Sequence, residues 1–124
     1  MSSRVPDVAA DETRNLIAAS KVNGTAVYNR AGESLGSIHD VMIDKVSGQV
    51  AYAVMSFGGF LGIGDRLHPL PWTELTYDTS LRGYVVDVSR DQLQEAPSYH
   101  HDERPWSDPL FARRLADYYP TPWG

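Results

Sequence analysis

The stretch Ser56–Asp65, SFGGFLGIGD, decides how the middle of this chain folds. It closes a run from Val46 to Gly64 that contains no charged residue. Such a stretch has three interpretations: a membrane-spanning helix, a glycine-rich loop that binds a phosphate, or a turn that joins two β-strands. Each interpretation leads to a different class of protein.

The membrane interpretation fails on glycine content. The uncharged run has 19 residues, close to the roughly 20 that a helix needs to cross a bilayer. However, eight of the 19 are Gly, Ser or Gln and five are Gly, and each Gly costs a helix about 1 kcal/mol relative to Ala. The preceding segment QVAYAVMSF (49–57) is rich in β-branched and aromatic residues, which favour strands. The sequence therefore predicts no transmembrane segment.

The phosphate-loop interpretation fails on context. Dinucleotide-binding folds place G-x-G-x-x-G between a strand and a helix, so that the helix N-terminus meets the pyrophosphate. Here Gly62-Ile63-Gly64 is followed by DRLH and a strand pattern, and no Walker lysine is present. The loop is predicted to be a structural turn whose glycines supply positive φ angles.

Strand signals recur at short intervals on both sides of this loop, with turn residues between them. Pro69 and Pro71 place the strand after the loop at a sheet edge or a bulge. Strands without intervening helices predict an all-β fold, a small antiparallel barrel or open sheet of about six strands. The segments are TAVYN (25–29), SLGSIHDVMID (34–44), VAYAVMSF (50–57), DRLHPLPW (65–72), ELTYD (74–78) and YVVDV (84–88).

Helix signals are few and lie mostly near the C-terminus. A capping box at Ser89 and Gln92 begins a short helix after the last strand. Asp108-Pro109 begins a helical arm with an apolar stripe. Near the N-terminus, Ser20 is a candidate N-cap for one short turn, which Gly24 ends.

These signals divide the chain into three parts. We expect a disordered leader over residues 1–15, a barrel domain over 16–98, and a C-terminal extension with one short helix over 99–124. The strand 50–57 is apolar on both of its faces, and such a strand is covered on both. One cover is the barrel interior, whereas the other is either the C-terminal helix or a second subunit. The small size of the domain favours a homodimer.

Composition limits the classes of partner and compartment. The chain has 124 residues, a formal net charge of -5 and no cysteine. The acidic balance disfavours nucleic acid and anionic membranes as partners. The N-terminus lacks the apolar core of a secretory signal, and the absence of cysteine fits a reducing compartment, so a cytoplasmic location is expected.

No set of residues predicts catalysis, a cofactor or a metal. Asp40 and Asp44 lie about 13 Å apart along a strand, too far to share a proton, and they are expected to accept hydrogen bonds from local turn N–H groups. Ser56 lies outside a G-x-S-x-G context. The histidines at 39, 68, 100 and 101 lack the convergent spacing of a metal site.

With the strands placed, the sequence resembles the PRC-barrel domain family. The resemblance covers roughly residues 16–98 and rests on three motifs: G-x-I-x-D-V-x-I-D over 36–44, G-G-F-L-G-I-G-D over 58–65, and P-W-x-x-L over 71–75. The family includes the cytoplasmic part of the photosynthetic reaction-centre H subunit and the C-terminal half of the ribosome maturation factor. The chain has neither the membrane helix of the former nor the N-terminal domain of the latter. The resemblance implies a compact barrel used for docking, with no shared catalytic residues.

We therefore expect a non-catalytic interaction or adaptor module, active as a homodimer or with an unidentified protein partner. The alternatives are a barrel that senses a small ligand or metal, and an RNA- or ribosome-associated accessory factor. The aromatic tail either packs on its own barrel or forms a contact surface for a partner. The predicted interaction surface comprises Tyr52, Val54, Phe60, Leu61, Ile63, Trp72, Trp106, Phe111, Leu115, Tyr118, Tyr119 and Trp123.

Overall fold

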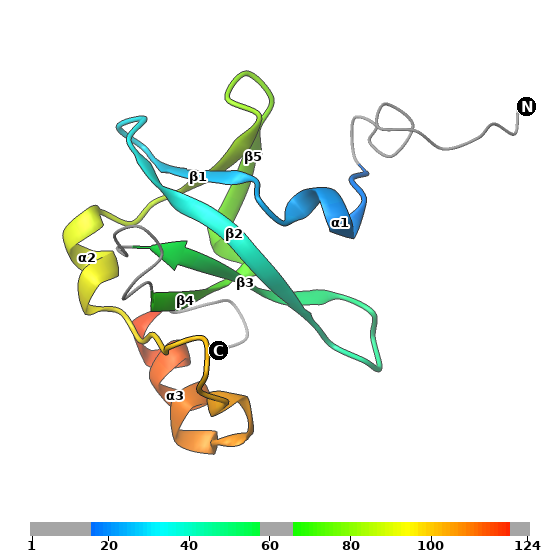
Figure 1. Cartoon of the computed structure of the whole chain (residues 1–124), viewed down its shortest axis with the longest axis vertical. Coiled ribbons are helices and arrows are strands. Elements are labelled where there is room, and N and C mark those ends of the chain that lie inside the picture. The colour runs from blue at the N-terminus through cyan, green and yellow to red at the C-terminus, as the bar shows by residue number, and fades with distance from the viewer. Residues whose placement is uncertain (1–15, 58–65, 120–124) are drawn as a thin grey trace, which may run out of the picture.

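The computed structural model of the chain describes residues 16–57 and 66–119 (Figure 1). Its main feature is one six-stranded sheet with the order β4-β3-β2-β1-β6-β5. The strands are β1 (Ala26–Asn29), β2 (Ser34–Ile43), β3 (Val50–Phe57), β4 (Arg66–Pro71), β5 (Leu75–Asp78) and β6 (Gly83–Val86). The α-helices are α1 (Ala19–Val22), α2 (Arg90–Glu95) and α3 (Pro109–Tyr118), and the 3-10 turns are η1 (Trp72–Glu74) and η2 (Pro105–Ser107).

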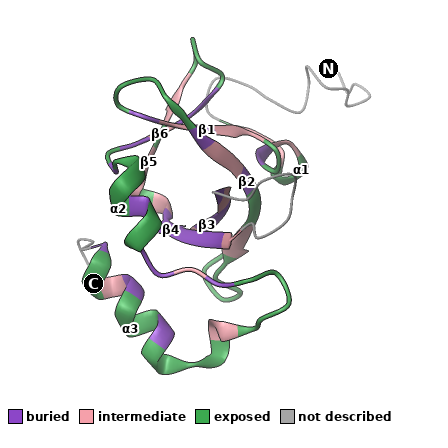
Figure 2. Cartoon of the chain, turned by 60° about the vertical axis from the view of Figure 1, so that its left-hand side comes forward, coloured by how far each residue is buried: buried purple, intermediate pink, exposed green. Residues whose placement is uncertain are grey.

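The sheet curls into a half-barrel, which confirms the predicted all-β architecture (Figure 2). Strands β1 to β4 form an antiparallel meander, and β5 and β6 form an antiparallel hairpin. The prediction of antiparallel pairing throughout is wrong at one place, because β1 and β6 pair in parallel. The reason is that η1 separates β4 from β5, and these two strands form opposite edges of the sheet. The β5–β6 hairpin therefore joins the sheet beside β1.

The glycine that begins the first family motif, Gly36, lies where the backbones of β2 and β3 approach closely. Gly36 lies in β2, where a Cβ atom would stand 2.0 Å from the carbonyl oxygen of Ser56 in β3. No real Cβ contact is that short, so the two strands can approach this closely only without a side chain at position 36. The glycine of the motif thus permits the β2–β3 pairing.

Buried apolar side chains lie on both sides of the sheet. Figure 2 shows buried positions along β3 and β4 and on α3. The largest of the fully buried residues are Ile38, Met55, Leu70, Leu93, Leu115, Val27, Val54, Val86 and Pro69. Val54 and Met55 are consecutive residues of β3, so both faces of this strand are covered, as its sequence predicts. β4 lies at the edge of the sheet, as its prolines predict.

The helix caps were predictable in two of three cases. The capping box of Ser89 and Gln92 begins α2, and Asp108 caps α3 through the N–H of Leu110. The prediction of Ser20 as an N-cap is wrong, because α1 begins at Ala19 and its N-cap, Ala18, offers no side-chain hydrogen bond. Within the described ranges, no helix has the length and apolar composition needed to cross a membrane.

Candidate interaction groove

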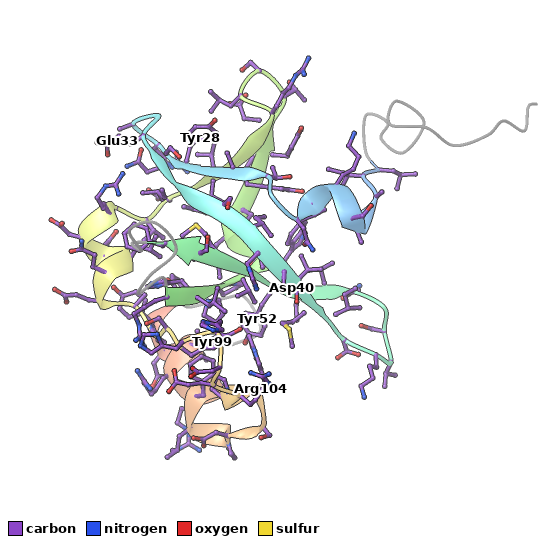
Figure 3. All side chains as sticks on the ribbon, in the orientation of Figure 1. Tyr28, Glu33, Asp40, Tyr52, Tyr99 and Arg104 are labelled. Carbon is purple, nitrogen blue, oxygen red and sulfur yellow. The ribbon has the colours of Figure 1, made fainter. Side chains whose placement is uncertain are left out.

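The C-terminal extension packs against the outer face of β3 and β4. Tyr99 pairs with Leu67 of β4 through two backbone hydrogen bonds of 2.8 and 3.0 Å. Beyond it, the Trp106 ring packs at a tilt against Tyr52 of β3, with ring centroids 5.5 Å apart, and edge-on against Phe111 of α3, with centroids 5.6 Å apart. Figure 3 shows Tyr52 and Tyr99 where this segment meets the sheet. The extension therefore covers, within the same chain, the apolar face that suggested a second subunit.

Polar contacts at the β4 edge reinforce this packing. The Arg66 guanidinium donates from Nε to the Ser98 hydroxyl at 2.6 Å and lies 2.7 Å from Nε2 of His100. The Tyr118 hydroxyl donates to the carbonyl of Gln92, which links α3 to α2. The segment that follows α2 is thus fastened to the sheet edge near its start.

The structure places the residues of the predicted interaction surface in four environments. Val54, Phe111, Leu115 and Tyr119 are buried. Tyr52, Trp72 and Trp106 are partly buried and pack against the core, whereas Tyr118 is 37% exposed. Phe60, Leu61, Ile63 and Trp123 lie outside the described residues. The structure brings Tyr52, Trp106 and Phe111 together as one aromatic cluster, but as a contact between the extension and its own sheet.

A groove remains open where α3 passes the end of the β2–β3 hairpin. Its volume is about 230 Å³. The turn between β2 and β3 supplies polar side chains, whereas β3, the end of β4 and α3 supply mostly apolar ones. The lining residues are Asp44, Ser47, Gln49, Val50, Ala51, Tyr52, Pro71, Leu115, Ala116 and Tyr119.

Asp44 is held rigidly at the rim of this groove. Its Oδ1 accepts hydrogen bonds from the backbone N–H groups of Val46 and Ser47, each at 2.9 Å. These bonds lower the pKa of the Asp44 carboxyl, the bond from Ser47 having the largest effect. The local turn role that the sequence predicts for Asp44 is therefore confirmed, and the carboxylate stays ionised at neutral pH.

Tyr119 closes the groove on the side of α3. The residue is 3% exposed, and its buried hydroxyl has no hydrogen-bond partner within residues 16–57 and 66–119. Burial raises the pKa of this phenol above its ordinary value, and the neighbouring Tyr118 and Glu74 raise it further. A buried hydroxyl without a partner costs about 1–3 kcal/mol of stability.

The turn beside the groove exposes two aliphatic side chains that sequence reasoning missed. Ile43 is 51% exposed and Val46 is 98% exposed, and they flank Asp44 in the chain. Figure 1 shows the β2–β3 hairpin projecting beyond the sheet. The available signal was Val46 itself, an aliphatic residue inside the turn sequence DKVSGQ, where polar residues are usual.

One further group with unusual chemistry lies in the barrel interior. His68 of β4 is 2% exposed, its Nδ1 has no hydrogen-bond partner, and its ring contacts Phe57 edge-on at 5.3 Å. Burial, with a smaller contribution from Arg66, lowers the pKa of His68 to about 4. The other histidines, at positions 39, 100 and 101, are exposed. Over residues 16–57 and 66–119, no three His, Asp or Glu side chains converge as a metal site would require.

Comparison with known proteins agrees with this fold. The sequence pattern that defines the PRC-barrel domain matches residues 14–93. The chain belongs to the PRC-barrel family. The match contains all six strands and most of α2, so the groove is formed where the PRC barrel meets the extension that follows it.

A second comparison finds an uncharacterized protein of Deinococcus radiodurans. It is 24% identical to this chain over 102 residues, which are 81% of this chain and 36% of that protein. The chain thus spans about a third of its relative's length. That relative is uncharacterized and adds no statement of function.

The PRC signature residues of this chain have structural roles. Gly36 permits the close approach of β2 and β3, and Asp44 holds the turn that follows β2. Pro71 ends β4, and Trp72 packs on Tyr84 of β6 at 5.4 Å. Two of these residues, Asp44 and Pro71, also line the groove, so the signature contributes to that surface as well as to the fold.

Proposed function

We propose that this PRC barrel is a non-catalytic protein-interaction module. The hairpin–helix surface, which we define as Ile43, Val46 and the groove residues, is its docking site. The observation that carries the proposal is the exposure of Ile43 and Val46 on a projecting hairpin. Exposed aliphatic side chains beside a concave, partly apolar surface are typical of protein–protein contact sites.

The chemistry of the described residues supports binding more than catalysis. The two groups whose pKa is most strongly displaced, His68 and Tyr119, are both buried and belong to different elements. Catalytic acid–base work requires such groups to reach a substrate and each other. Their burial makes them structural groups in this proposal. We assign the module to the cytoplasm on its acidic, cysteine-free composition.

The proposal is tested by partner capture with matched variants. Wild-type protein and Val46→Glu are used as bait in the same cell extract, with Leu81→Glu as control. Leu81 is also an exposed aliphatic residue, 40% accessible, in the turn between β5 and β6. We expect a partner that wild type and Leu81→Glu retain and Val46→Glu loses. Capture that Val46→Glu leaves unchanged would contradict the docking site.

Light scattering on the same three proteins shows whether the partner is a second copy of the chain. A homodimer formed through the hairpin–helix surface gives the mass of two chains for wild type and Leu81→Glu, and of one chain for Val46→Glu. A monomer in all three cases assigns the surface to a different protein.

A further inference from the structure

The groove has a size that suits one side chain of a partner. Pockets for drug-sized ligands span about 300–1,000 Å³, whereas this groove offers about 230 Å³. A water molecule occupies about 30 Å³ in the liquid, so the space corresponds to roughly eight waters. A single long side chain fills such a space.

The charge of the groove selects the sign of that side chain. Among the described residues that line it, Asp44 is the one with a formal charge, and its carboxylate is fixed by the turn. Glu74, close enough to Tyr119 to act on its phenol electrostatically, adds a second negative charge nearby. Lys45 follows Asp44 in the turn but is not part of the lining. A cation is therefore attracted to the groove, and an anion is repelled.

The remaining walls suit the stem of a basic side chain. Val50, Pro71 and Leu115 present aliphatic surface between the polar turn and α3. Lys and Arg bury their methylene chains along apolar surface while the charged head stays at a polar rim. Tyr119 also lines the groove, while its hydroxyl is shielded from solvent.

We propose that the groove between the β2–β3 turn and α3 accepts a Lys or Arg side chain of the protein partner, with Asp44 as the counter-charge. This inference rests on the proposed function, since it names the partner chemistry of the same surface. Ile43 and Val46 then contact apolar residues of the partner beside that basic side chain.

The first test uses a small probe in place of the partner. Butylguanidinium, which reproduces the end of an arginine side chain, is titrated into the full chain and followed by ¹H–¹⁵N NMR. Butylurea, its uncharged analogue, is the matched ligand. We expect saturable shifts at the amides of Gln49, Val50, Ala51 and Ala116 with butylguanidinium, and weaker binding of butylurea.

The second test changes the counter-charge. Asp44→Asn keeps an Oδ1 that accepts the two turn N–H bonds but removes the charge. The control is Asp78→Asn, because Asp78 accepts the same kind of bonds from Ser80 and Leu81 in the β5–β6 turn, at 2.9 and 3.1 Å. We expect Asp44→Asn to weaken butylguanidinium binding by about two- to five-fold, the range of exposed ion pairs, and Asp78→Asn to leave it unchanged.

Three results would each overturn the inference. The two probes bind with equal affinity, Asp44→Asn leaves butylguanidinium affinity unchanged, or the NMR shifts occur only on other surfaces. The partner-capture experiment separates this failure from failure of the proposed function. If Val46→Glu loses the partner but Asp44→Asn binds it as tightly as wild type does, the docking site is supported. The inference that the groove accepts a basic side chain is then wrong.

Discussion

Acid is expected to destabilise this protein through one buried histidine. His68 lies in the barrel interior, its Nδ1 has no hydrogen-bond partner among the described residues, and its pKa is lowered to about 4 in the folded state. In the unfolded chain the pKa returns to its ordinary value of 6.5. Between pH 6.5 and pH 4 the unfolded state therefore binds more protons, and stability falls as the pH falls through this window.

The size of the effect follows from the two pKa values. One pKa unit corresponds to 1.36 kcal/mol, so the complete shift of His68 amounts to about 3 kcal/mol. At pH 4.5, where protonation of the folded state has only begun, linkage gives a loss of about 2 kcal/mol relative to neutral pH. Small domains have about 5–15 kcal/mol in total, so a single imidazole controls a large share of the acid stability.

The assay is urea unfolding at pH 7 and pH 4.5, followed by tryptophan fluorescence, for wild type and His68→Leu. Carboxylates also titrate in this range, but they do so in both proteins, so the difference between the two pH dependences isolates His68. We expect His68→Leu to lose about 2 kcal/mol less than wild type between pH 7 and pH 4.5. The control His101→Gln changes an exposed histidine and should follow wild type.

An NMR titration of the wild-type histidines gives a direct second readout of the same group. The His68 ring protons should remain those of a neutral imidazole down to about pH 4. Identical pH dependences for wild type and His68→Leu, or a His68 titration near pH 6.5, would refute the reasoning, because either result means that the imidazole is not excluded from water.

Three further predictions concern the fold. Gly36→Ala should prevent folding or lower the free energy of unfolding in urea by several kcal/mol, because its Cβ would stand 2.0 Å from the Ser56 carbonyl oxygen. The control is Ser37→Ala, and equal stability of the two variants would contradict the close approach of β2 and β3. Ser89→Ala should cost about 1 kcal/mol by removing the capping box of α2, and an unchanged urea midpoint would show that the cap is dispensable. Leu115→Ala should cost about 2–5 kcal/mol because Leu115 is 1% exposed, whereas Leu110→Ala, on the exposed side of α3, should be near neutral; equal costs would mean that α3 does not pack as described.

Local features of the sequence were enough to place most elements. The alternation of side chains in β6, with Tyr84 and Val86 inward, follows from the two-residue period of a strand. The capping box at Ser89 acts over three residues, and the prolines of β4 exclude a central position because they cannot donate to a neighbouring strand. Such signals need no knowledge of distant contacts, so they can be read directly from the chain.

The candidate site depended on contacts that no local pattern encodes. The apolar outer face of β3 required a cover, but the chain's own residues 99–119 and a second subunit satisfied that requirement equally until the fold placed Trp106 on Tyr52. Likewise, Asp44 was predictable as a turn residue, whereas the groove beside it exists only because α3 returns to that turn.

The sequence by itself determined the strands, two of the three helix caps and the resemblance to the PRC-barrel family, because each of these depends on residue type and short spacing. Only the tertiary structure decided the parallel pairing of β1 with β6, the burial of His68, and the side of the barrel that the extension covers. These depend on how segments far apart in the chain pack against one another, where many weak apolar contacts add up and no single residue carries the signal.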